Sequence, residues 1–168
     1  MNHPIIAIKV KNFGTMTAEL YPEKAPLTVA NFLKLCDENF FEGLIVHRII
    51  KGFMIQGGGY TEDMEHKECD AIRGEFKANG FMPNDLKHTR GVLSMARTSD
   101  PDSASSQFFV MHMDAPHLDA QYAGFGKVTE GLDVLDAIAS VRTGSYGWYM
   151  QDVPKEPVVI ETIEVISR

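Results

Sequence analysis

One short segment places a permanent cation among apolar residues. Residues 44–56 read Leu-Ile-Val-His-Arg-Ile-Ile-Lys-Gly-Phe-Met-Ile-Gln. In an extended strand alternate side chains share a face, and those that accompany Arg48 are Leu44, Val46 and Ile50. A guanidinium is costly to bury alone, so Arg48 must be solvated at a groove or paired with a carboxylate. The strand leaves a functional and a structural Arg48 equally open, and it favours a hydrogen-bonded structural role for His47.

Other chemistry-bearing residues form no recognised motif. The run His66-Lys67-Glu68-Cys69 matches no metal-binding spacing, and a solvated loop explains it better. His112 and His117 lack accompanying cysteines or carboxylates. The glycines at 57–59 are not followed by the Gly-Lys-Ser/Thr of a phosphate-binding loop, and Ser94 lacks a Gly-x-Ser-x-Gly setting. We therefore expect no metal and no cofactor.

The elements around this segment are predicted to be mainly strands. Apolar residues alternate over 6–10 and 16–20, with Asn and Gly between them, which predicts a β-hairpin. Helical spacing predicts short helices at 27–39 and about 130–140, the first with Pro26 in its first turn. Six further strands are expected, at 44–50, 53–56, 92–96, 107–111, 125–128 and 158–165. This pattern predicts one domain, residues 1–168, built as an antiparallel β-barrel or sandwich capped by helices.

Three segments are longer than ordinary hairpin loops, namely 57–91, 97–106 and 142–157. Loops of this length in a small domain are more often functional than idle. They are therefore the expected source of residues that surround Arg48.

Bulk properties exclude several classes of protein. The 168 residues carry a formal net charge of -7, which argues against a nucleic-acid or anionic-membrane surface. No run approaches the roughly 20 apolar residues that span a bilayer. The N-terminus is interpreted as the first strand, with nothing that directs export. Two cysteines make no disulfide framework, so we expect a cytoplasmic protein with Cys36 buried in the first helix.

Five blocks, in order along the chain, resemble the cyclophilins. They are the segment 46–58 (Val-His-Arg-Ile-Ile-Lys-Gly-Phe-Met-Ile-Gln-Gly-Gly), Gly74-Glu75-Phe76, residues 86–96 (Leu-Lys-His-Thr-Arg-Gly-Val-Leu-Ser-Met-Ala), Ser105-Ser106-Gln107-Phe108-Phe109, and Leu118-Asp119 with Phe125-Gly126-Lys127-Val128. The resemblance covers almost the whole chain and is closest to a compact single-domain bacterial form. It implies a closed eight-stranded antiparallel barrel with a helix over each end, and an active groove on the outer wall.

The resemblance also implies site residues. Arg48 matches the catalytic arginine of this family of peptidyl-prolyl cis-trans isomerases, and Gln56 matches the residue that orients it. The walls of the proline pocket are implied to be Phe53, Met54, Phe109 and Leu118. Ala96 and Arg97 match positions whose backbone pairs with the substrate, and Gln107 matches a residue of the neighbouring subsite.

Three of the matched positions depart from the family pattern. Arg97 stands where a small polar residue is usual, which implies a changed preference for residues beside proline. His117 replaces a frequent tryptophan, and Tyr122 a frequent histidine, at the border of the proline pocket. We therefore expect catalysis with weakened cyclosporin binding.

Two hypotheses follow for the function. The first is an isomerase that acts on proline-containing peptides and folding proteins, and the second is a chaperone or scaffold that holds proline segments with little turnover. The joint presence of Arg48, Gln56 and Phe109 favours the enzyme, since a pure binder could lose the arginine. A monomer is expected, and a nucleic-acid binder would need a basic face.

Overall fold

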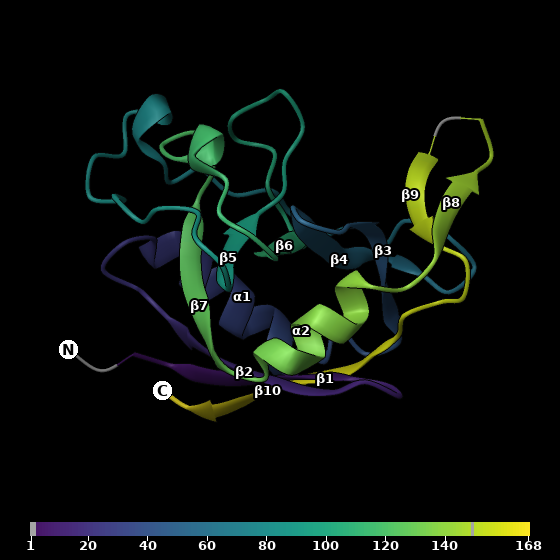
Figure 1. Cartoon of the computed structure of the whole chain (residues 1–168). Helices are drawn as coiled ribbons and strands as arrows, with labels where there is room; N and C mark the ends of the chain where they lie inside the picture. Colours follow the sequence, from purple (N-terminus) through teal and green to yellow (C-terminus); the bar gives the residue numbers. More distant parts are fainter. Residues whose placement is uncertain (1–2, 149) are drawn as a thin grey trace.

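The computed structural model describes residues 3–148 and 150–168, and its main feature is one eight-stranded antiparallel sheet. The sheet curls around a central core, with the strands in the order β10-β1-β2-β7-β5-β6-β4-β3 (Figure 1). The strands of this sheet are β1 (Ile5–Val10), β2 (Gly14–Leu20), β3 (Leu44–Ile50), β4 (Met54–Thr61), β5 (Val92–Met95), β6 (Phe108–Met111), β7 (Gly124–Glu130) and β10 (Ile160–Ser167). All eight predicted strands are present in this sheet.

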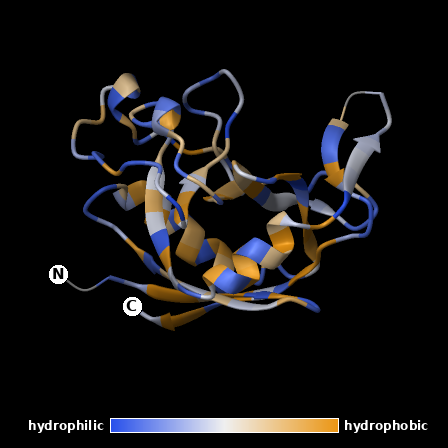
Figure 2. Ribbon diagram, viewed as in Figure 1, coloured by the Kyte–Doolittle hydropathy of each residue, from blue (hydrophilic) through white to orange (hydrophobic). Residues whose placement is uncertain are grey.

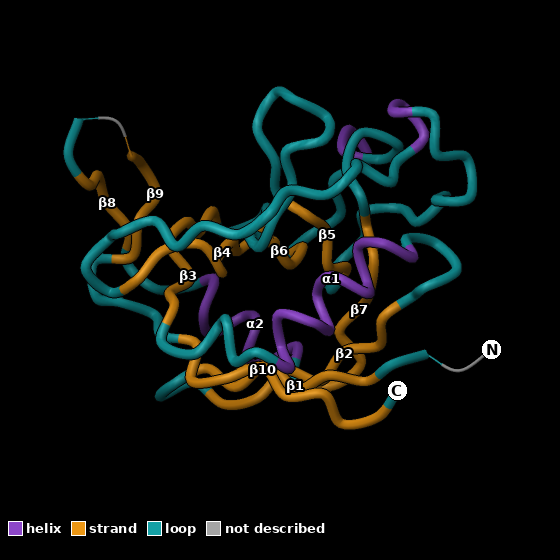
Figure 3. The backbone as a smooth tube through the Cα atoms, turned by 180° about the vertical axis from the view of Figure 1, so that it is seen from behind, coloured by secondary structure: helices purple, strands orange, loops and turns teal. Residues whose placement is uncertain are grey.

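The two predicted helices are present as α1 (Pro26–Asp37) and α2 (Leu132–Ala139). Figure 1, with α2 in front, and Figure 3, with α1 in front, show one helix at each end of the curled sheet. Two single-turn 3-10 helices, η1 (Lys77–Asn79) and η2 (Pro116–Leu118), lie in the long connections. None of the helices among the described residues is long and apolar enough to cross a membrane.

The prediction of a closed barrel is wrong, because the ladder of strands is open between β3 and β10. One bridge, Ile45 to Val159, and two backbone hydrogen bonds, Val46 N–H to Val158 O at 2.8 Å and Gly43 N–H to Ile160 O at 2.9 Å, join the two edges. Proline has no N–H to donate, and Pro157 lies next to the segment 158–160 that faces β3. The segment that would complete the barrel therefore cannot form a continuous ladder, and the sheet is a curled half-barrel.

A second, two-stranded sheet lies in a segment expected to be a loop. Strands β8 (Thr143–Tyr146) and β9 (Met150–Pro154) form an antiparallel hairpin beyond β3 at the edge of the main sheet (Figure 1). Its residues alternate poorly in polarity and include two glycines and a proline, which explains why no strand was predicted there. Of the three long segments, 142–157 is thus partly regular.

The core fills the space between the curled sheet and the two helices. Figure 2 shows hydrophobic residues concentrated on the strands and helices around the centre. The Phe32 ring of α1 lies at its middle, with ring centroids 5.0 Å from Phe41, 5.3 Å from Phe108 and 5.2 Å from Phe125. Cys36 is buried, as predicted, and burial raises the pKa of its thiol to about 12. It is therefore a small hydrophobic core residue.

Helix α1 is capped from a distance by Glu75. The residue before the helix, Ala25, offers no capping side chain. The Glu75 carboxylate, 1% exposed, accepts hydrogen bonds from Leu27 N–H at 3.1 Å, Thr28 N–H at 2.7 Å and the Thr28 hydroxyl at 2.8 Å. Since the first N–H groups of a helix have no partner within it and carry partial positive charge, a buried carboxylate there satisfies both needs. This explains the Gly74-Glu75-Phe76 block.

Candidate active site

A β-bulge in β3 turns Arg48 outward. Val46 pairs with Gly57 and Arg48 pairs with Gln56. Between these two pairs the chain moves by two residues in β3 but by only one residue in β4. A bulge changes which face the following side chains occupy. Leu44, Val46 and Ile49 therefore lie in the core, whereas Arg48 is exposed. The strict alternation predicted for this strand, with Arg48 on the face of Leu44 and Val46, is wrong, and regular pairing would have pointed the guanidinium into the core.

The close approach of β4 to the bulge requires a glycine. A Cβ on Gly57 would lie 2.6 Å from the Ile45 carbonyl oxygen and 2.8 Å from the Val46 Cα. Only glycine fits at that distance. The glycine run at 57–59 therefore belongs to β4, which extends beyond the strand predicted at 53–56.

Strand pairing places three predicted site residues in one row. Arg48 on β3 is opposite Gln56 on β4, and Gln56 is opposite Phe109 on β6. The Arg48 Nη1 lies 3.5 Å from Gln56 Oε1, and Gln56 Nε2 donates to Gln107 Oε1 at 3.1 Å. An amide with one oxygen and one NH₂ group can accept from Arg48 and donate to Gln107 at once. Gln56 is thereby held facing the guanidinium.

A cavity of about 130 Å³ lies beside this row. It is smaller than the roughly 300–1,000 Å³ pockets that enclose drug-sized ligands, so it suits one side chain of a longer peptide. The cavity is lined by Arg48, Phe53, Met54, Gln56, Ala96, Arg97, Phe109, Leu118 and Tyr122. All nine are among the eleven predicted site residues. The other two lie against it: Gln107 bonds to Gln56, and the His117 ring stacks on Phe53 with centroids 5.8 Å apart.

The apolar wall of the cavity rests on a buried histidine that sequence reasoning missed. His88, 1% exposed, stacks on Phe109 at 6.0 Å, and Tyr122 meets Phe109 edge-on at 5.7 Å. His88 Nε2 lies 2.8 Å from the Ser94 hydroxyl, and its Nδ1 lies 3.2 Å from Asp119. Burial lowers the pKa of His88 against the opposing effect of Asp119. Ser94 is fully buried, so this Ser-His-Asp set supports the pocket and has no access to a substrate.

A second missed histidine, His112, links α2 to the turn that carries Phe53. Gly52 N–H donates to His112 Nδ1 at 2.8 Å, so the ring proton is on Nε2, which lies 3.0 Å from Asp136. His112 N–H donates to the Phe53 carbonyl at 2.9 Å. Arg90 holds Asp136 with two hydrogen bonds of 2.8 and 2.9 Å, which lowers the pKa of that carboxyl. No short motif reveals this set, because its members are far apart in the sequence.

His47, beside Arg48, is a buried structural residue, but it is not the hydrogen-bonded residue that was expected. Its ring is 5% exposed and packs 4.6 Å from the Tyr60 ring, and its Nδ1 has no hydrogen-bond partner within the described chain. Burial, with the positive charges of Arg48 and His66, lowers the pKa of His47 from 6.5 to about 4. The ring is therefore neutral at neutral pH.

This pKa shift predicts a loss of stability in acid. Between pH 6.5 and 4 the unfolded chain binds a proton at His47 that the folded chain does not, so the free energy of unfolding falls as pH falls. The full shift corresponds to about 3 kcal/mol. In urea titrations from pH 7 to 4, wild type should lose about that much more stability than His47→Phe, in which His88 still titrates. Parallel pH profiles for the two proteins would refute this assignment.

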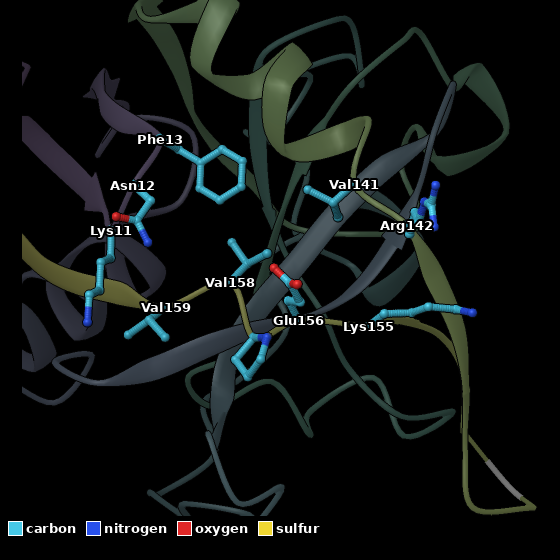
Figure 4. Close-up of a pocket in the computed structure, with 10 residues that line it drawn as sticks. Lys11, Asn12, Phe13, Val141, Arg142, Lys155, Glu156, Val158 and Val159 are labelled. Carbon is cyan, nitrogen blue, oxygen red and sulfur yellow. The ribbon is translucent and has the colours of Figure 1, made fainter.

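A larger pocket, about 520 Å³, lies elsewhere, between the β1–β2 turn, the end of α2 and residues 155–159 (Figure 4). Lys11 and Lys155 extend away from its centre, whereas Phe13 and Glu156 face it (Figure 4). None of the eleven predicted site residues lines it. Size alone is a poor guide here, because the smaller cavity has the row of polar donors beside an apolar wall. Within residues 3–148 and 150–168, no group of three or more His, Cys, Asp or Glu side chains could hold a metal ion.

Comparisons with known proteins agree with the fold. The family model of cyclophilin type peptidyl-prolyl cis-trans isomerases matches residues 5–165. A peptidyl-prolyl cis-trans isomerase of Acinetobacter baylyi is 47% identical over 161 residues, covering 93% of this chain and 82% of that protein. Peptidyl-prolyl cis-trans isomerase B of Escherichia coli is 44% identical over 163 residues, covering 92% and 95%.

Solved structures of cyclophilin type isomerases have a similar fold. A crystal structure of a Cryptosporidium parvum cyclophilin type isomerase matches with a TM-score of 0.83 and 27% identity over 99% of both chains. The same protein in the presence of the dipeptide Ala-Pro matches with a TM-score of 0.80 and 28% identity, over 98% of this chain and 99% of that one. The chain belongs to the cyclophilin family. Its activity is that of a peptidyl-prolyl cis-trans isomerase.

The link through His112 predicts different effects for two substitutions. Asparagine places its amide oxygen near the position of Nδ1 and can still accept from Gly52, whereas glutamine reaches toward Asp136 and leaves Gly52 without a partner. The loss of this partly buried hydrogen bond, which holds the turn that carries Phe53, corresponds to a factor of about ten in kcat/KM. We expect His112→Gln to lower kcat/KM about tenfold and His112→Asn less than threefold, in peptide isomerisation assays. Equal losses in both variants would show that His112 matters only for folding.

Proposed function

We propose that Arg48 catalyses rotation about X–Pro bonds by donating a hydrogen bond to the twisted prolyl nitrogen. Amide resonance opposes rotation with a barrier of roughly 18–20 kcal/mol. As the bond leaves planarity, the nitrogen gains a lone pair that neither planar isomer offers. A donor aimed at that nitrogen therefore binds the transition state better than either ground state, which is the condition for catalysis. The permanently charged guanidinium supplies several such donors.

The neighbouring residues have supporting roles in this proposal. Phe53, Met54, Phe109 and Leu118 enclose the proline ring and exclude water, which strengthens the hydrogen bond from Arg48. Gln56 holds the guanidinium from one side, since it is fixed in turn by Gln107. Ala96 and Arg97 present their backbone to the substrate chain. The reaction makes and breaks no covalent bond, so it needs no general base.

The observation that carries this proposal is the row Arg48–Gln56–Phe109 across three paired strands, with the cavity beside it. It favours the enzyme over a proline-segment-binding chaperone with little turnover, because binding alone does not need the cation. Exchange NMR on an Ala-Pro peptide tests it with no auxiliary protease. The proposal requires catalytic amounts of protein to speed exchange at least 100-fold; binding without faster exchange would support the chaperone.

The proposal also covers the clients of the protein, its compartment and its oligomeric state. The clients are proline-containing peptides and folding proteins whose slow X–Pro isomerisation limits folding. We further propose that the chain acts as a cytoplasmic, monomeric single domain. The free thiols Cys36 and Cys69 and the net charge of -7 support a reducing compartment without nucleic-acid or membrane partners.

Cyclosporin is expected to bind more weakly than to relatives that have tryptophan at the position of His117. The smaller imidazole stacks on Phe53 at the edge of the cavity and covers less apolar surface. The chain's tryptophan, Trp148, lies in the β8–β9 hairpin and does not line the cavity. Titration should give a dissociation constant at least tenfold lower for His117→Trp than for wild type. Tight binding by wild type, unchanged in the variant, would overturn this expectation.

A further inference from the structure

The charge of the cavity is opposite to that of the whole protein. Its nine lining residues include two guanidinium groups, Arg48 and Arg97, and no carboxylate, whereas the chain carries a net charge of -7. Neither arginine forms an ion pair with any described residue. A proline ring is neutral and gains nothing from a nearby charge. Arg48 has a role in catalysis, whereas the charge of Arg97 has no role in holding the ring.

The Arg97 charge is held in a fixed place. Its guanidinium carbon lies 4.8 Å from the Phe76 ring centroid and 4.6 Å from that of Tyr122, so the group is sandwiched between two aromatic faces. Its Nη1 donates to Thr98 O at 2.9 Å and its Nη2 to Gln121 O at 2.7 Å. Its Nε is buried without a hydrogen-bond partner. A long flexible side chain has thus become a rigid part of the cavity wall.

Asp100 and Asp119 are close in sequence to Arg97 and to its partner Gln121, and neither forms an ion pair with Arg97. Asp100 accepts from Asp102 N–H at 2.9 Å, and Asp119 accepts from His88 N–H at 2.6 Å. The groups that accept hydrogen bonds from Arg97 are neutral carbonyls, so its guanidinium keeps a full positive charge without a salt-bridge partner among the described residues. Such a charge acts on whatever segment lies across the cavity, over a Debye length of about 10 Å at 0.1 M salt.

We propose that Arg97 makes this isomerase selective for X–Pro segments with an acidic residue adjacent to the proline. The inference rests on the proposed function, since it concerns the substrate of the same cavity. Arg48 faces the X–Pro bond, which all substrates share. Arg97 lies one residue beyond Ala96, beside the side chains of the substrate residues next to proline, which differ between substrates. A Glu or Asp there is attracted, and a Lys or Arg is repelled.

The test compares peptides that differ only in the residue before proline (Glu, Gln or Lys), and a second series that differs only after it. Exchange NMR gives kcat/KM without a protease whose own preference would intrude. For exposed charges at this range we expect Glu to exceed Lys about three- to tenfold at low salt in at least one series. The ratio should fall toward one in 0.5 M salt.

Variants assign the preference to one residue. Arg97→Gln should bring the Glu-to-Lys ratio near one, and Arg97→Lys should retain most of it. Arg142→Gln changes the net charge equally but lies at the other pocket, and it should leave the ratio unchanged. Because ratios are compared, a general loss of activity does not obscure the result. Equal rates in both series, or a ratio that Arg97→Gln does not alter, would overturn the inference, while absence of all isomerisation would overturn the proposed function itself.

Discussion

Arg48→Ala should lower kcat/KM for X–Pro isomerisation by about 100- to 1,000-fold, the range found when one donor to a transition-state charge is removed. The cavity, Gln56 and Phe109 remain in this variant, so the proline ring still binds. Arg48→Lys keeps the charge but not the planar fork and should recover only part of the loss. The measurement is the exchange rate of an Ala-Pro peptide at several enzyme concentrations.

A folding defect is readily separated from this effect. Arg48 is exposed, and among the described residues its side chain makes one hydrogen bond, the 3.5 Å interaction with Gln56. The free energy of unfolding should therefore change by less than about 0.5 kcal/mol. An Arg48→Ala protein that is fully folded and fully active would contradict the role given to this residue.

Glu75→Ala should produce the largest loss of stability among polar substitutions considered. It removes three hydrogen bonds to a buried carboxylate and leaves two N–H groups of α1 without partners, at a cost of about 4 kcal/mol. Glu75→Gln keeps one acceptor oxygen and should lose about half as much. Urea titration at pH 7 measures both, with the exposed Glu62→Ala expected to change stability by less than about 0.5 kcal/mol.

The loss expected for Glu75→Ala is large because α1 has no capping side chain of its own and packs Phe32 at the centre of the core. A frayed first turn would loosen that aromatic cluster as well as the helix. A Glu75→Ala protein as stable as wild type would show that water replaces the carboxylate at the helix end.

Much of the fold was predictable from the sequence, because alternation and helical spacing are local. The bounds of β3 agree with the prediction, and α1 and α2 are within two residues of theirs. The opening between β3 and β10 was not foreseen, since it depends on how Pro157 interrupts pairing with a strand over a hundred residues away. The β8–β9 hairpin was missed because its polar, glycine-containing sequence has no period of two.

The grouping of the site residues came from the family resemblance. Local patterns alone left the role of Arg48 open, and they put it on the wrong face relative to Val46, because a bulge is set by pairing with β4. His88 and His112 were missed as supports for the same reason: their partners Asp119, Gly52 and Asp136 are distant in sequence. Contacts of that kind exist only in the folded chain.

The central claim is that Arg48 acts on the twisted bond and not on either planar isomer. NMR line shapes of a saturating X–Pro peptide give both its dissociation constant and its exchange rate while bound. For Arg48→Ala, the account predicts that bound exchange slows at least 100-fold while the dissociation constant changes less than threefold. Bound exchange as fast as in wild type, with all the loss in affinity, would contradict it.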